Sequence, residues 1–139
     1  MVHVYRLSES ALKTVSAASK IATEVLLPNA ADVDAQGRYP TESLKALADA
    51  GLFGLCLSGD VGGKGEGMRA FAGVVEELSG KCASTAMVYV MHVAASQAIA
   101  TSSMNRAVSN HSKTMIGQIL RSNRGCAVFY DNGSNIPEY

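Results

Sequence analysis

The feature that most constrains this chain is a long stretch without charged residues between Lys81 and Arg106. On a helix with 3.6 residues per turn, its apolar residues would fall on every side. A helix here would therefore have to be surrounded by other elements. Ser84 or Thr85 is suited to cap its start by accepting a backbone N–H. Many alanines along the stretch would let other elements, or a ligand, approach the backbone closely. The pattern predicts a buried central helix from Ser84 to about Ala100.

A membrane span is the alternative, since about 20 predominantly apolar residues can cross a bilayer. Several polar residues stand against it, because such side chains are costly near the centre of a span. They are Ser84, Thr85, His92, Ser96, Gln97 and Thr101-Ser102-Ser103. We therefore expect no membrane span.

Three further helices are expected near residues 10–26, 41–50 and 67–79. In the first, apolar residues recur every three or four positions, and Pro28 is expected to stop the helix. This inward stripe consists of Leu12, Val15, Ala18, Ala22 and Val25. Gly51 is well placed as the left-handed residue that ends the second helix. The fold class predicted is all-α: an up-and-down, bundle-like domain around one buried central helix, with an irregular C-terminal tail.

Length and composition narrow the class of protein. A chain of 139 residues suits one domain, and a net charge of zero gives no reason to expect nucleic acid or acidic membranes as partners. Cys56, Cys82 and Cys126 lie far apart, and the histidines are not at ligand spacing, so we expect neither a metal site nor a disulfide framework. A reducing cytoplasm is the expected location.

A glycine-rich run from Ser58 to Gly67 invites comparison with a phosphate-binding loop. A P-loop ending in Gly63-Lys64 would need glycine at position 58, where Ser58 stands, and Ser or Thr at position 65, where Gly65 stands. We expect instead a tight loop whose glycines adopt positive φ angles.

Several short motifs occur in a particular order and spacing along the chain. They are Gly37-Arg38-Tyr39-Pro40, Leu47 to Gly54, Asp60-Val61-Gly62-Gly63, Val74 to Leu78, and Cys82-Ala83-Ser84-Thr85-Ala86 through His92. Together they resemble the N-terminal helical domain of the acyl-CoA dehydrogenases over about residues 8–103.

The resemblance implies an FAD-dependent oxidation of the CH–CH bond of an acyl-CoA, with electrons passed to an electron-transferring flavoprotein. It also implies that the long helix forms one wall of the slot for the acyl chain. Ala86, Met87 and Val90 would contact that chain. Without the resemblance, these three side chains would simply be assigned to the core.

The tail departs from the family pattern, so the expected division is a domain over residues 1–103 and a tail over residues 104–139. Ser112 to Ser122 can form a short helix with four apolar residues inward, namely Met115, Ile116, Ile119 and Leu120. Cys126 to Tyr130 is a possible strand. We expect the tail to be poorly packed or to dock on a neighbour.

No catalytic residue and no cofactor-binding residue is predicted. Glu76 and Glu77 are interpreted as surface charge, because adjacent helical positions point in different directions; His92 is interpreted as a core histidine. In the family, the flavin and the catalytic base belong to later domains, so this chain alone is expected not to retain FAD and to be inactive. Its partners would be acyl-CoA and the missing dehydrogenase domains, or further copies in a homo-oligomer. The alternative hypothesis is a non-catalytic helical interaction module.

Overall fold

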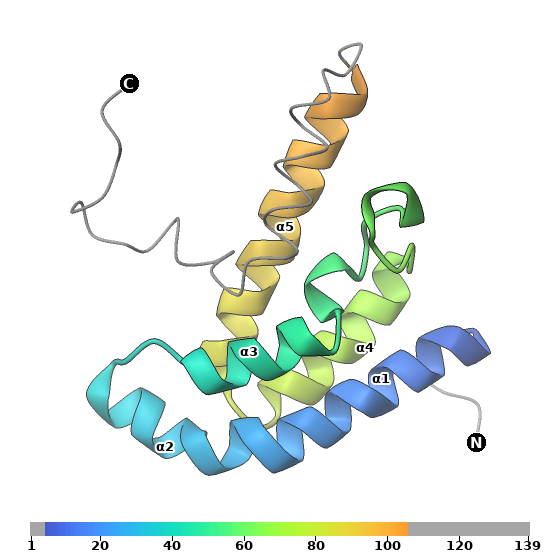
Figure 1. Cartoon of the computed structure of the whole chain (residues 1–139). Coiled ribbons are helices and arrows are strands. Elements are labelled where there is room, and N and C mark those ends of the chain that lie inside the picture. Colours follow the sequence, from blue (N-terminus) through green and yellow to red (C-terminus); the bar gives the residue numbers. More distant parts are fainter. Residues whose placement is uncertain (1–4, 106–139) are drawn as a thin grey trace, which may run out of the picture.

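The structure is a computed structural model that describes residues 5–105, with side chains up to Thr101 (Figure 1). The predicted helix and strand of the tail lie outside the described residues. The main helices are α1 (Glu9–Ile21), α2 (Leu27–Gln36), α3 (Thr41–Asp49), α4 (Met68–Ser79) and α5 (Ala83–Asn105). Between them lie a π-helical turn, η1 (Ala22–Leu26), and two short 3-10 turns, η2 (Leu52–Gly54) and η3 (Gly59–Val61). Residues 5–105 contain no strand, which confirms the all-α prediction.

Helix α5 buries one face in the core that α1, α3 and α4 help to form. The largest fully buried side chain is that of Tyr89, and Ala86 and Val93 lie on the same face. The opposite face is different: Met87, Met91 and Ala94 are exposed. Among residues 5–105, neighbours therefore bury α5 on one face, and the expectation of cover on every side is not met by this part of the chain. In Figure 1 the C-terminal half of α5 extends beyond the other helices.

The prediction that Pro28 stops the first helix is wrong, because helical structure runs without a break from Glu9 to Gln36. The π-helical turn η1 ends at Leu26, two residues before the proline, and the N–H of Leu27 donates to the carbonyl of Ala22. Pro28 then falls in the first turn of α2, just after the π-helical turn, where the backbone hydrogen bonds change from the π to the α pattern. Gly37, in the left-handed conformation with φ 58°, ends α2.

At the start of α1, the buried residue is Ala11 and not Leu12 as predicted, so the inward stripe begins one residue earlier. Leu12 is 39% exposed, whereas Ala11 and Val15 are buried. Helix α4 approaches α1 closely here, since a Cβ on Gly73 would lie 3.0 Å from Cγ2 of Val15. The spacing of three and four residues is as predicted, but the packing against α4 decides which residues face inward.

Candidate functional site

Two hydrogen bonds attach the inner face of α5 to the chain that follows α3. The hydroxyl of Tyr89 donates to the backbone carbonyl of Leu52 at 3.0 Å, and the side-chain amide of Gln97 donates to the carbonyl of Cys56 at 2.5 Å. Gly51, with φ 69°, turns the chain into this segment and has the left-handed conformation predicted for it. The orientation of α5 is thus set along two turns of its length.

His92 lies on the same inner face and is 5% exposed. Its ring centroid is 4.3 Å from that of Phe53, and its Nε2 is 3.4 Å from the hydroxyl oxygen of Ser96. Burial lowers the pKa of His92, and a hydrogen bond with the backbone of Phe53 partly opposes this shift. The interpretation of His92 as a core histidine is confirmed.

The opposite face of α5 carries what we call the outer stripe: Ala83, Met87, Met91, Ala94 and Ala98. All five are exposed, Met87 by 61% and Met91 by 47%. Their spacing of three and four residues places them along one side of the helix. No charged residue occurs anywhere in α5. The outer stripe is therefore an uncharged, largely apolar surface built on a firmly attached helix.

The structure separates the three residues predicted to contact an acyl chain. Ala86 is 3% exposed and belongs to the core, Met87 is exposed, and Val90 is partly buried beside the outer stripe. Of these three residues, only Met87 and Val90 are open to a ligand on the face of the outer stripe. The sequence analysis missed Met91 and Ala94, although their spacing of four and seven residues from Met87 could have shown them to share its side of the helix.

The glycine-rich loop has its backbone N–H groups turned inward. Those of Gly63, Lys64 and Gly65 donate to carbonyls of Ser58, Gly54 and Leu57 at 2.8–3.0 Å. Gly62 and Gly65 have φ angles of 86° and 67°, as expected for a tight loop. These donors are used within the protein, so the loop does not present them to a phosphate.

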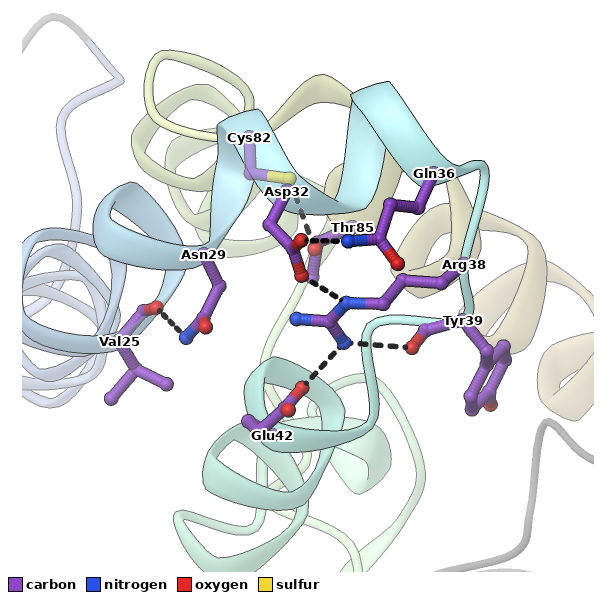
Figure 2. A network of polar contacts seen from close by, with 9 residues as sticks. All are labelled: Val25, Asn29, Asp32, Gln36, Arg38, Tyr39, Glu42, Cys82 and Thr85. Atoms are coloured by element: carbon purple, nitrogen blue, oxygen red, sulfur yellow. Dashed lines mark hydrogen bonds and ion pairs between the residues drawn. The ribbon is translucent and has the colours of Figure 1, made fainter.

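A surface network joins the end of α2 to the start of α3 (Figure 2). The guanidinium of Arg38 bonds to the carboxylates of Asp32 and Glu42, and the side chain of Gln36 donates to Asp32. A backbone hydrogen bond of Glu42 itself, and then the bond from Arg38, lower the pKa of Glu42. All four side chains are occupied with one another, which indicates a structural role.

A second contact joins α2 to the start of α5, since the hydroxyl of Ser84 donates to Asp34 at 2.6 Å. Ser84 and Thr85 lie inside α5, and the hydroxyl of Thr85 bonds to the sulfur of Cys82 at 3.2 Å. The prediction that one of them caps the helix by accepting a backbone N–H is therefore wrong.

Two kinds of site are absent from the part of the chain that the structure describes. No three His, Cys, Asp or Glu side chains gather there as metal ligands would. No helix in the same region has the length and hydropathy needed to cross a membrane.

Glu76 and Glu77 occupy adjacent positions of α4. Glu76 is exposed, and Glu77 is partly buried.

Comparison with known proteins places this helical arrangement in a family. Residues 8–106 match the acyl-CoA dehydrogenase N-terminal domain, and this range includes every helix described above. The chain belongs to the acyl-CoA dehydrogenase family. The match ends at Arg106, and residues 107–139 lie outside it.

Relatives of this acyl-CoA dehydrogenase domain include proteins named for different activities. The 3-sulfinopropanoyl-CoA desulfinase of Paraburkholderia xenovorans is 31% identical over 87 residues, which are 63% of this chain and 22% of the relative. The short-chain specific acyl-CoA dehydrogenase of Clostridium acetobutylicum is 34% identical over 65 residues, 47% of this chain and 17% of the relative.

An acryloyl-CoA reductase (NADH) from Anaerotignum propionicum is 34% identical over 74 residues, 53% of this chain and 19% of the relative. The acyl-CoA dehydrogenase domain thus spans about a fifth of the length of the curated relatives it matches. No solved structure matches the chain.

Proposed function

We propose that this chain is the N-terminal part of an FAD-dependent acyl-CoA dehydrogenase, in which the outer face of α5 forms one wall of the acyl-chain slot. The assembled enzyme would oxidise the CH–CH bond of an acyl-CoA and pass electrons to an electron-transferring flavoprotein. The missing dehydrogenase domains, or other copies of the chain, would close the slot.

The single observation that carries the proposal is the uncharged outer stripe on α5 within a domain of this family. Met87 and Val90 would contact the acyl chain, because both are open on this face. Ala86 is buried behind them, and its contact with an acyl chain stays a prediction. Methionine is suited to such a wall, since its unbranched thioether side chain adapts to irregular apolar shapes.

The described residues do not fit FAD by themselves. The glycine-rich loop is the candidate for a phosphate site, and its N–H groups donate to Ser58, Gly54 and Leu57 instead. The cofactor's chemistry, acceptance of hydrogen from the acyl chain, would therefore depend on parts of the enzyme beyond this domain. In the proposed function this chain supplies binding and orientation of the acyl group.

Calorimetric titration of the purified chain with acyl-CoA esters of increasing length tests the acyl wall. We expect weak binding that strengthens with chain length, because each buried CH₂ contributes about 0.8 kcal/mol. Met87→Glu should weaken binding of the longest ester at least about tenfold, which corresponds to about 1.4 kcal/mol. Ala17→Glu, on an exposed position of α1, is the matched control and should bind like the unchanged chain.

The alternative, a non-catalytic helical interaction module, uses the same exposed face, whose uncharged character suits a protein partner as well. The titration separates the two functions. If no ester binds, or if Met87→Glu binds as tightly as the unchanged chain, the acyl-slot proposal is wrong and the interaction module is favoured.

A further inference from the structure

The segment that follows α3 lacks backbone donors for two of its carbonyls. Within residues 52–57, the other carbonyls accept N–H groups from the same segment or from the glycine-rich loop; they are those of Leu52, Gly54, Leu55 and Leu57. The carbonyls of Phe53 and Cys56 receive no backbone N–H from the described residues. Because Phe53 is buried and Cys56 partly buried, each of these carbonyls needs a donor from another element.

Helix α5 supplies both donors from its inner face. His92 forms a hydrogen bond with the backbone of Phe53, and this bond favours the protonated ring, as expected when a ring N–H donates to a carbonyl. The side-chain amide of Gln97 donates to the carbonyl of Cys56 at 2.5 Å. Tyr89 differs from these two residues, because the Leu52 carbonyl that it reaches also accepts a backbone N–H.

Gln97 stands where α5 has little other support. In Figure 1 the C-terminal half of α5 extends beyond the other helices. Gln97 lies in this half, is partly buried, and is bonded to a residue 41 positions earlier in the chain. It is the last residue of α5 for which the described part of the chain shows a side-chain hydrogen bond to another element. The placement of this half of the helix therefore depends on Gln97.

The outer stripe changes in character along α5. Its first half carries Met87 and Met91, and its second half carries Ala94 and Ala98. A methionine side chain has several rotatable bonds, so it can adapt when the helix backbone shifts slightly. An alanine side chain cannot, and a shift of the backbone moves the surface there by the same amount. The surface at Ala94 and Ala98 is thus placed only as well as the backbone beneath it.

We propose that Gln97 is a positioning residue of the acyl slot, which holds Ala94 and Ala98 at a fixed place in the slot wall through the Cys56 carbonyl. The inference rests on the proposed function and deepens it, because it identifies what places the second half of the wall. Gln97 itself lies off the outer stripe and acts only through the position of the helix.

Gln97→Met tests the proposal, because methionine is also long and unbranched but cannot donate a hydrogen bond. In calorimetric titration with acyl-CoA esters of increasing length, this variant should bind the longest ester at least about fivefold more weakly than the unchanged chain. Tyr89→Phe is the matched control. It too loses a hydrogen bond between α5 and the segment 52–57, but the Leu52 carbonyl keeps the N–H of Leu55, so ester binding should not change.

Hydrogen exchange followed by mass spectrometry shows where each variant has changed. Residues 94–101 should exchange faster in Gln97→Met than in the unchanged chain, and at the same rate in Tyr89→Phe. Faster exchange together with unchanged ester affinity would mean that Gln97 serves stability alone, which would overturn the proposal. Loss of ester affinity in Tyr89→Phe as large as in Gln97→Met would overturn it as well.

The unchanged chain separates this inference from the proposed function. If the unchanged chain binds no ester, the acyl-slot proposal fails and the role of Gln97 fails with it. If the unchanged chain binds the esters and Gln97→Met binds them as tightly, only the role of Gln97 is wrong. Should Gln97→Met not fold, exchange in the unchanged chain decides: the longest ester should slow residues 94–101, and no slowing there would overturn the proposal.

Discussion

Gly63 occupies a place where no side chain fits. A Cβ there would lie 2.1 Å from the carbonyl oxygen of Leu57, which itself accepts the N–H of Gly65. We expect Gly63→Ala to lower the free energy of unfolding by about 1–3 kcal/mol, the usual cost of overpacking. Urea denaturation measures this. Gly59→Ala is the matched control, because nothing lies within 4 Å of its Cβ position, and it should change stability by less than about 0.5 kcal/mol.

His92 should make stability depend on pH. Burial lowers its pKa, so the unfolded chain binds this proton more readily than the folded protein does. The contribution is fully present above about pH 6.5, the ordinary histidine value, and is lost as the pH falls through the lower pKa of the folded state. The free energy of unfolding should therefore decrease from pH 7 to pH 5.

The matched variant is His92→Gln, which keeps a polar side chain but cannot titrate. The difference in unfolding free energy between the two proteins should shrink as the pH falls. A difference that stays constant from pH 7 to pH 5 would mean that His92 titrates alike in both states. Histidines elsewhere in the chain are common to both proteins and cancel in the comparison.

Individual residues show which buried positions can be predicted from the spacing of apolar residues. The three-and-four spacing predicted an inward stripe on the first helix, and Val15 and Ala18 are buried. Leu12 is exposed while Ala11 is buried, and α1 packs on α4 at Val15 beside Gly73, a contact between residues far apart in the sequence. The same limit applies to the candidate site, where Ala86 proves to be in the core and Met87 exposed.

Among the elements, α5 depends on its attachment to the turn η2. Tyr89→Phe removes the hydroxyl that donates to Leu52, but the Leu52 carbonyl still accepts the N–H of Leu55. We therefore expect a loss of only about 0.5–1.5 kcal/mol in the free energy of unfolding, measured by thermal or urea denaturation. Tyr89→Ala, which empties a fully buried site, should cost about 3–5 kcal/mol. Equal losses of unfolding free energy in Tyr89→Phe and Tyr89→Ala would contradict the prediction that the buried ring contributes more than the hydroxyl.

The junction of α2 and α3 should respond to salt. Arg38 bridges Asp32 and Glu42, and its side chain is 27% exposed. Arg38→Met should lower the melting temperature in dilute buffer and lower it by less in 1 M NaCl, because salt screens such pairs. Lys45→Met, at a more exposed single pair with Asp49, is the control and should cost less than about 0.5 kcal/mol. Melting at several salt concentrations measures both.

Element boundaries were predictable where a glycine or a composition change marks them. Gly37 and Gly51 have the left-handed conformations that end helices, and the helix after Gly67 begins within one residue of its expected start. The continuation past Pro28 was not predictable. A π-helical turn has no sequence signature of its own, so the position of Pro28 in a first helical turn shows only in the structure.

At the scale of the whole molecule, the domain is a scaffold with one large apolar face still open to solvent in the described residues. We predict that the purified chain neither retains FAD nor reduces a dye with acyl-CoA as substrate. Tight flavin binding needs an enclosed site with several directed polar groups. The N–H groups of Gly63, Lys64 and Gly65 in the glycine-rich loop donate to carbonyls within the protein and do not supply such groups. A flavin absorbance band after gel filtration would contradict the prediction.

The π-helical turn of residues 22–26 has a consequence for how the domain can vary in length. A π-helical turn takes up one residue more than an α-helical turn does, so removing one residue there, for example the exposed Thr23, would leave the later residues on nearly the same faces. The deletion would, however, place Pro28 inside a continuous α-helix, where its ring clashes with the carbonyl four residues before it. Substitutions on the exposed side of this turn should therefore be tolerated, whereas deletions should destabilise the domain. The extra residue in this turn is what allows a proline to stand within so long a helical stretch.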